Sequence, residues 1–171
     1  MKNTMNELNN FKIDCMYGKK KHYNARDRFA DYHRKMGAGI VVLTAIMGTS
    51  VYWSLSKSEI LLAQIIVGVF ILLNAVLVAL QTYLNFEKLA LRHKVTADRY
   101  LWLMKEAKRL IAYYQDGNKT KEDIQGELER LCQEAKEIQK DEPETSWGDF
   151  RKARDGVTND EELYSEKEKQ V

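Results

Sequence analysis

Apolar and polar positions divide the chain into an uncharged centre and two charged flanks. Residues 36–55 and 60–84 carry no charged side chain, and only residues 56–59 separate these two blocks. A helix rises about 1.5 Å per residue and the hydrocarbon core of a bilayer is roughly 30 Å thick, so each block is long enough to cross it. The pattern predicts two transmembrane helices in an antiparallel hairpin. The alternative is a buried hairpin of a soluble domain, which the polar flanks are poorly suited to cover.

Short signals within the hairpin support this interpretation. Ser56 and Glu59 have the spacing of a capping box, which would begin the second helix. Tyr52 and Trp53 lie at the outer end of the first block, where amphipathic rings favour the membrane interface. Small residues, which let another helix approach closely, recur in the first block. They are Gly37, Gly39, Thr44, Gly48, Thr49 and Ser50.

The flanks have helical patterns of their own, so the predicted fold class is all-α. We expect 1–18 to be flexible and a helix to begin near Lys19, with His22, Ala25 and Phe29 on its apolar face. The second span has no stop signal at its end, which predicts one continuous helix from about Ser58 to Tyr114, with 85–114 outside the membrane. A break near Asn85 or Arg92 is the alternative.

Another helix is predicted over 120–140, after a turn. Gly117 can adopt a left-handed C-cap, and Thr120 with Asp123 resembles a capping box. This helix is expected to return antiparallel along 85–114, or to pair with its copy in another subunit. Its apolar positions alternate at steps of four and three, as in a packing seam. The seam consists of Ile124, Leu128, Leu131, Ala135 and Ile138.

The C-terminal region begins at Pro143, the only proline in the chain, which is expected to end the preceding helix. Trp147 and Phe150 are predicted to dock their rings onto the helical bundle. Residues 151–171 are charged and are expected to form a disordered tail.

Charge distribution predicts the orientation in the membrane. Lys and Arg residues crowd both flanks next to the predicted spans, whereas the connecting loop holds only Lys57. Basic residues beside a span favour the cytoplasmic side. Both termini are therefore expected to face the cytoplasm of a bacterial inner membrane. Cys15 and Cys132 are not spaced for a zinc site or a disulfide framework and are expected to be reduced structural thiols.

Polar side chains in the second span suggest a function. Asn74 and Gln81 lie seven residues apart on one helical face, which continues through Asn85. An amide in hydrocarbon is costly without a partner. These three residues are candidates to line the pore of a homo-oligomer. The alternative is that Asn74 only binds a hydroxyl group of the first span, such as that of Thr44.

Basic side chains beyond the second span have two interpretations. They could bind an anion such as a nucleotide or an acidic partner surface, or they could only set topology and contact lipid headgroups. The residues are Lys88, Arg92, Lys94 and Arg99. No binding of nucleic acid itself is expected.

Catalytic patterns do not stand out in the sequence. The histidines at positions 22, 33 and 93 lack metal-ligand spacing and are expected to be polar residues near the membrane interface. The chain has no Gly-rich phosphate loop and no nucleophile elbow. We expect a protein that is not an enzyme and has no metal or cofactor.

A family resemblance agrees with this organisation. The basic helix with His22-Tyr23-Asn24-Ala25-Arg26 and Arg28-Phe29, the short-looped hairpin and the long helical return resemble the SLATT domains over 19–150. SLATT domains are two-transmembrane effectors of bacterial conflict systems. The resemblance implies pore formation that depolarises or permeabilises the membrane in antiphage defence, triggered by a nucleotide second messenger or a companion sensor protein. The alternatives are a non-conducting adaptor whose helical bundle recruits a soluble partner and, third, a small membrane enzyme.

Overall fold

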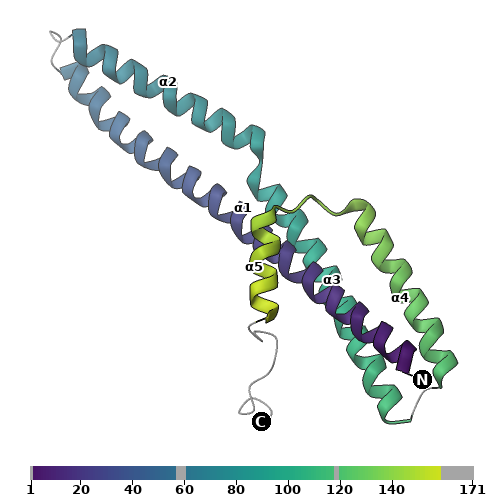
Figure 1. Ribbon diagram of the computed structural model, residues 1–171. Coiled ribbons are helices and arrows are strands. Elements are labelled where there is room, and N and C mark those ends of the chain that lie inside the picture. Colours follow the sequence, from purple (N-terminus) through teal and green to yellow (C-terminus); the bar gives the residue numbers. More distant parts are fainter. Residues whose placement is uncertain (1, 57–60, 118–119, 159–171) are drawn as a thin grey trace. The chain divides into compact units, whose positions relative to one another are not determined.

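The computed structural model describes residues 2–56, 61–117 and 120–158 (Figure 1). Helix accounts for 94% of these residues and no strand occurs among them, which confirms the predicted all-helical class. The helices are α1 (Lys2–Ser56), α2 (Leu61–Leu84), α3 (Phe86–Gln115), α4 (Lys121–Asp141) and α5 (Trp147–Thr158). The predicted capping box at 56–59 lies largely outside the described residues.

The chain divides into two compact units. The first comprises residues 1–27 and 90–171, and the second comprises residues 28–89. The helices α1 and α3 each contribute residues to both units. We describe the first unit as the bundle unit and the second as the hairpin unit, each by itself.

The core of the bundle unit lies between α1, α3 and α4. The predicted seam of α4 is buried throughout, and it packs with Tyr100, Leu103, Ala107 and Leu110 of α3. Figure 1 shows α4 running back along α3. The return of α4 onto its own chain is therefore confirmed, and the seam is not available to another subunit.

Local signals set the turn before α4 as predicted. Gly117 has a φ of 72°, the left-handed conformation that a glycine adopts without strain. Thr120 is the N-cap of α4, and Asp123 N donates to its Oγ1 at 3.3 Å while Thr120 N donates to Asp123 Oδ2 at 3.0 Å. This reciprocal pair completes the capping box.

The N-terminal segment differs from the prediction. Helix α1 begins at Lys2, not near Lys19, so the segment 1–18 is helical wherever it is described and is not a flexible arm. Leu8 and Cys15 are buried in the core formed with α3 and α4. Packing against distant parts of the chain stabilises a segment whose local pattern is weak, because helical order in proteins depends largely on tertiary contacts.

The C-terminal helix also differs from the prediction. Trp147 is 68% exposed, so its predicted docking is wrong, and Phe150 is only partly covered, with its ring 6.3 Å from that of Tyr17. The face of α5 that is buried carries Asp149, Ala153 and Gly156. Helix α5 continues to Thr158, beyond the predicted end of order at residue 150.

A capping box explains which face of α5 is buried. Ser146 donates to Asp149 Oδ2 through both its N, at 3.0 Å, and its Oγ, at 2.7 Å. Asp149 N donates back to Ser146 Oγ at 3.2 Å. The box satisfies the first turn of the helix and turns Asp149 inward, which leaves Trp147 on the outer side.

Asn85 interrupts the helix that was expected to be continuous. Its φ is 42°, and it separates α2 from α3. Its Oδ1 accepts a hydrogen bond from Lys88 N at 3.2 Å, so the side chain caps the start of α3. Asn tolerates the left-handed region better than most residues because its short polar side chain bonds locally. The single helix over 58–114 is wrong, and the alternative break near Asn85 is confirmed.

The hairpin unit contains the apolar helix. Among the described residues, one helical stretch, Gln64–Gln115, is long and apolar enough to cross a membrane, and none of its most apolar window is buried. The part of this stretch that lies in α2, residues 64–84, carries no charged side chain. Near the end of the unit the Phe86 ring packs against Phe29, at 6.0 Å between ring centroids, and against Tyr32, at 5.6 Å.

Candidate functional site

A buried polar cluster in the bundle unit joins three parts of the chain. His22 of α1 and His93 of α3 face each other with 3.0 Å between their Nδ1 atoms, and both rings are almost completely buried. The Nε2 of His22 lies 3.2 Å from Glu142 Oε2. Glu142 also accepts hydrogen bonds from Tyr100 Oη, at 2.7 Å, and from Lys21 Nζ, at 2.9 Å. We call these five residues the histidine cluster.

The local sequence places each member of the histidine cluster. His22 lies on the face of α1 that the sequence identified as apolar, three residues before the buried Ala25. Glu142 is the C-cap of α4 with extended backbone, immediately before Pro143. Because the residue before a proline disfavours helical geometry, the chain turns there and brings the carboxylate to the two rings. His22 also stacks on Tyr100, with 5.9 Å between ring centroids.

Charge is balanced inside the cluster. Burial alone would raise the pKa of Glu142, but hydrogen bonds from His22, Lys21 and Tyr100 outweigh it and lower that pKa to about 2. Burial, followed by the hydrogen bond to Glu142, raises the pKa of Tyr100 well above its ordinary range. At neutral pH the cluster therefore holds an ionised carboxylate and a neutral phenol.

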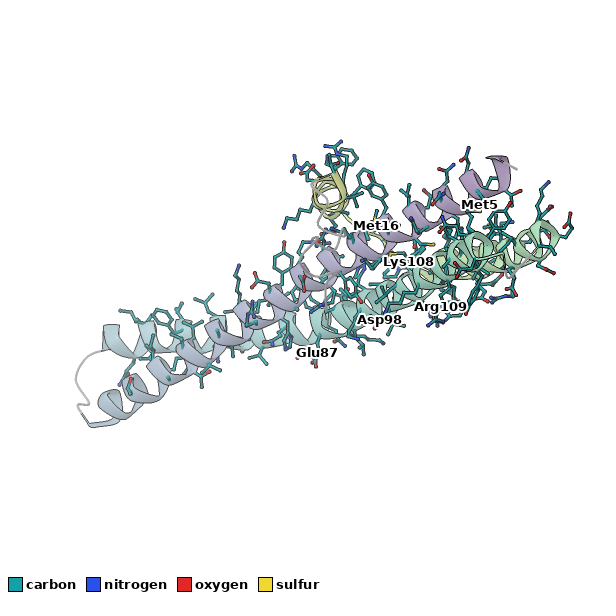
Figure 2. All side chains as sticks on the ribbon, turned by 90° about the horizontal axis from the view of Figure 1, so that it is seen from below. Met5, Met16, Glu87, Asp98, Lys108 and Arg109 are labelled. Atoms are coloured by element: carbon teal, nitrogen blue, oxygen red, sulfur yellow. The ribbon has the colours of Figure 1, made fainter. Side chains whose placement is uncertain are left out.

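A second polar contact joins α1 to α3 one turn away. Tyr23 donates to Asp98 Oδ1 at 2.6 Å, and Lys94 binds Asp98 Oδ2 at 2.8 Å (Asp98 is labelled in Figure 2). Burial, with the hydrogen bond to Asp98, raises the pKa of Tyr23 to about 12. Asn24 Nδ2 donates to the backbone oxygen of Asp149, which ties α5 to α1. Three consecutive residues of α1, 22 to 24, thus each bind a different partner.

A cavity of about 540 Å³ adjoins the histidine cluster. Lys21 and Tyr100 belong to both. The remaining lining combines apolar and aromatic residues with two further cations and one carboxylate. These residues include Phe11, Tyr17, Phe150, Cys15, Cys132, Lys136, Arg154 and Asp14.

Two of the three candidate pore residues, Asn74 and Gln81, lie on the side of α2 that faces α1. Asn74 Nδ2 donates to Thr44 Oγ1 at 3.1 Å, and Asn74 Oδ1 is buried without a hydrogen-bond partner. A Cβ on Gly37 would lie 3.6 Å from Gln81 Nε2, so Gln81 also lies against α1. Asn85 is the cap at the start of α3. The hydrogen bond to Thr44 is the one expected under the alternative interpretation, in which Asn74 binds a hydroxyl group of the first span.

The candidate basic residues are exposed on α3. Lys88, Arg92, Lys94 and Arg99 all have solvent-accessible side chains. Lys94 forms an ion pair with Asp98 of its own helix. None of these four residues is a member of the histidine cluster or of the cavity lining, whose cations are Lys21, Lys136 and Arg154.

The histidine cluster was not predicted. His22 and His93 were expected to be polar interfacial residues, and their burial shows that expectation to be wrong. One signal was present, because His22 falls on an apolar helical face where a polar residue needs a buried partner. The described residues contain no group of three or more His, Cys, Asp or Glu placed to hold a metal ion.

Comparison with known proteins identifies the family. A family model matches residues 7–169, nearly the whole chain, and confirms the resemblance to SLATT domains. No curated protein and no solved structure matches the chain. The chain belongs to the SMODS and SLOG-associating 2TM effector domain family 4, one of the SLATT families of effector domains in conflict systems.

Proposed function

We propose that this protein is a non-enzymatic effector that forms a homo-oligomeric pore in the bacterial inner membrane and depolarises or permeabilises it during antiphage defence. The observation that carries the proposal is the surface of α2. Large apolar side chains are exposed along it, including Leu61, Ile65, Val69, Leu72, Leu73 and Val76. An apolar surface of this extent on a soluble protein would promote aggregation, whereas lipid covers it without cost.

The proposal includes the two-span hairpin with both termini in the cytoplasm. Helix α2 has 24 residues. At about 1.5 Å per residue its length exceeds the thickness of a bilayer core, which is roughly 30 Å. The uncharged end of α1 would form the other span. Topology can be tested with a membrane-impermeant maleimide in intact cells, on single cysteines that replace Lys57 in the loop or the exposed Lys152 of α5. We expect labelling at position 57 only; labelling at position 152 contradicts the orientation.

Native cysteines would mislead this test. Cys15 is 2% exposed, and burial raises the pKa of its thiol to about 12. Burial also raises the pKa of Cys132. Because the thiolate is the reactive form, neither reports on topology. The single cysteines therefore belong in a chain with both native thiols replaced by alanine.

The polar side of α2 suggests how a closed state is held. Asn74 and Gln81 lie against α1, and one oxygen of Asn74 is buried without a partner, which costs about 1–3 kcal/mol. We propose that the described arrangement is the resting one, and that opening turns these amides toward the axis of an oligomer, where water satisfies them. Gly39, Gly48 and Gly68 have open space where a Cβ would lie, which leaves room for helices of further copies.

Membrane potential provides the test. The full chain is expressed in bacterial cells with its neighbouring genes, the cells are challenged with phage, and a potential-sensitive dye is followed. We expect depolarisation before lysis, and we expect Asn74→Leu or Gln81→Leu to change its onset or extent. Leu72→Ala, at a lipid-facing position that is 68% exposed, is the matched control. A full defence response without loss of potential would refute the pore.

The alternative function is a non-conducting membrane adaptor. Its expected docking surface, the seam of α4, is buried within the chain, so an adaptor would have to use other residues. Trp102 and Trp147 are exposed at 44% and 68% and are the residues to examine. Defence that persists without depolarisation but fails in Trp102→Ala would favour the adaptor.

For the trigger, we propose a nucleotide second messenger or a companion sensor protein. The lining of the cavity beside the histidine cluster suits a nucleotide, because aromatic rings stack on bases and cations pair with phosphate. Titration of the full chain with a fluorescent nucleotide tests this. Lys136→Glu should weaken binding, whereas Lys152→Glu, outside the cavity lining, should not.

A further inference from the structure

The joint between α2 and α3 lies at Asn85, one turn before the hairpin unit ends. We propose that this joint has two states: the bent state of the structure, and a straight state in which α2 and α3 form one continuous helix and α2 is turned about its axis. The turn would move Asn74 and Gln81 away from α1. This consequence rests on the proposed function, in which opening moves the same amides, but the joint itself can be measured without it.

In the bent state, residues on both sides of the joint face α1. Before the joint, Gln81 Nε2 lies 3.6 Å from the position that a Cβ on Gly37 would take. After the joint, the Phe86 ring packs against Phe29 and Tyr32, at 6.0 Å and 5.6 Å between ring centroids. All of these residues belong to the hairpin unit. The bend therefore lets α2 and the first turn of α3 contact the same helix at once.

A continuous helix cannot make both contacts. Gln81 and Phe86 are five residues apart, which at about 100° per residue places them roughly 140° apart around a straight helix axis. Only one of the two side chains could then face α1. If the Phe86 ring keeps its aromatic partners, straightening turns α2 by about 140°. Asn74 shares a face with Gln81, so both amides would leave α1 together.

Local interactions are compatible with both states. Asn85 has a φ of 42°, which asparagine tolerates, and its Oδ1 accepts a hydrogen bond from Lys88 N at 3.2 Å. Helical hydrogen bonds persist on either side of the bend, from Asn85 N to Gln81 O and from Leu89 N to Asn85 O, each at 3.2 Å. In the straight state Lys88 N would donate to Leu84 O instead. Neither proline nor glycine lies near the joint in the sequence, so the chain can also continue there as a helix.

A distance between two spin labels tests the proposal. Nitroxides are attached to Val42→Cys of α1 and Leu72→Cys of α2, two exposed positions, in the full chain with both native thiols replaced by alanine. The labelled chain is diluted with unlabelled chain in lipid nanodiscs, so that only distances within one chain are measured. Leu72 lies on the side of α2 opposite Gln81, because nine residues are two and a half helical turns. A turn of α2 should therefore shorten the distance by on the order of 10 Å, the diameter of a helix.

Substitutions at Asn85 should change the populations of the two states. Asn85→Leu favours the straight state, because leucine is a good helix former that neither tolerates the left-handed conformation nor caps α3. We expect the ratio of short to long distances to rise about tenfold or more. Asn85→Gly is the matched control, since glycine adopts the left-handed conformation freely, and the long distance should remain dominant. If Asn85→Leu does not fold, Asn85→Ala replaces it, because it has the same two effects with a smaller side chain.

Two results would overturn the joint. One is an unchanged distance in Asn85→Leu, or in Asn85→Ala where that variant replaces it; the other is an equal rise of the short distance in Asn85→Gly. Failure of the pore is distinguishable from failure of the joint. A short distance in Asn85→Leu, together with phage-challenged cells that keep their membrane potential, supports the joint and refutes the pore. Depolarisation of those cells with an unchanged distance refutes the joint alone.

Discussion

Substitution of Gly18 by alanine tests how closely α1 packs on α3. A Cβ at position 18 would lie 2.8 Å from Cδ1 and 2.9 Å from Cγ of Tyr100. Because Cγ lies on the axis of the ring, rotation of the ring about the Cβ–Cγ bond cannot relieve this contact. The ring or the helix must move, and the Tyr100 hydroxyl must then leave Glu142, to which it donates at 2.7 Å.

Opposing contributions set the change in the free energy of unfolding that we expect for Gly18→Ala. Replacing a glycine by alanine inside a helix stabilises it by about 1 kcal/mol. Overpacking in a tight core costs about 1–3 kcal/mol. Loss of a hydrogen bond to a charged group costs about 1.5–3 kcal/mol. The cost exceeds the gain, so we expect Gly18→Ala to destabilise the bundle unit by about 1.5–5 kcal/mol.

Denaturation of the full chain in nanodiscs, followed by hydrogen exchange of bundle-unit peptides, measures this change. Gly126→Ala is the matched control, because Gly126 is also helical and nothing lies within 4 Å of its Cβ position. That control should gain up to about 1 kcal/mol. In a Tyr100→Ala background, Gly18→Ala should become neutral or stabilising. Equal stability of the two single glycine variants would refute the argument.

Three further predictions concern single residues. Because the pKa of Glu142 is lowered from its ordinary 4.5 to about 2, its ionised form stabilises the fold above about pH 4.5, and this stabilisation is lost as the pH falls toward 2. Glu142→Gln should therefore cost about 3 kcal/mol at pH 7 and flatten the acid limb of a stability profile measured by denaturant titration. Leu131→Ala, at a fully buried core position, should cost about 2–5 kcal/mol in the same assay, and a cost below 1 kcal/mol would contradict the core assignment. Asn85→Ala should destabilise the start of α3 by about 1–2 kcal/mol, because it loses the cap and places a Cβ in the left-handed region. Asn85→Gly should lose only the cap, and hydrogen exchange at 86–90 would show whether the two variants differ.

Features that depend on neighbouring residues in sequence were predictable. Gly117, Thr120 and Asp123 act within one turn of the chain, and the structure uses them as the turn and the capping box that the sequence indicated. The seam from Ile124 to Ile138 was recognisable because its periodicity matches the helix, and every member is buried. The family followed from the order of such elements.

Features that depend on partners distant in the chain were not predictable from the sequence. Residues 2–18 look too polar for a stable helix until α3 and α4 cover Leu8 and Cys15. Trp147 looks like an anchor, but the capping box of Ser146 and Asp149 turns the other face of α5 inward. Asn85 was one of two candidate break points, and nothing nearby in sequence distinguished it from Arg92.

The sequence by itself determined that this protein is helical, where the turn and capping box before α4 fall, and that it carries a long apolar segment of the SLATT kind. Each of these properties depends on residues within a few positions of one another. Tertiary structure alone decided the candidate site. His22, His93 and Glu142 are separated by 71 and 120 positions in the chain. Only the packing of α1 against α3, with the turn before Pro143, brings their atoms within hydrogen-bond distance and removes them from water.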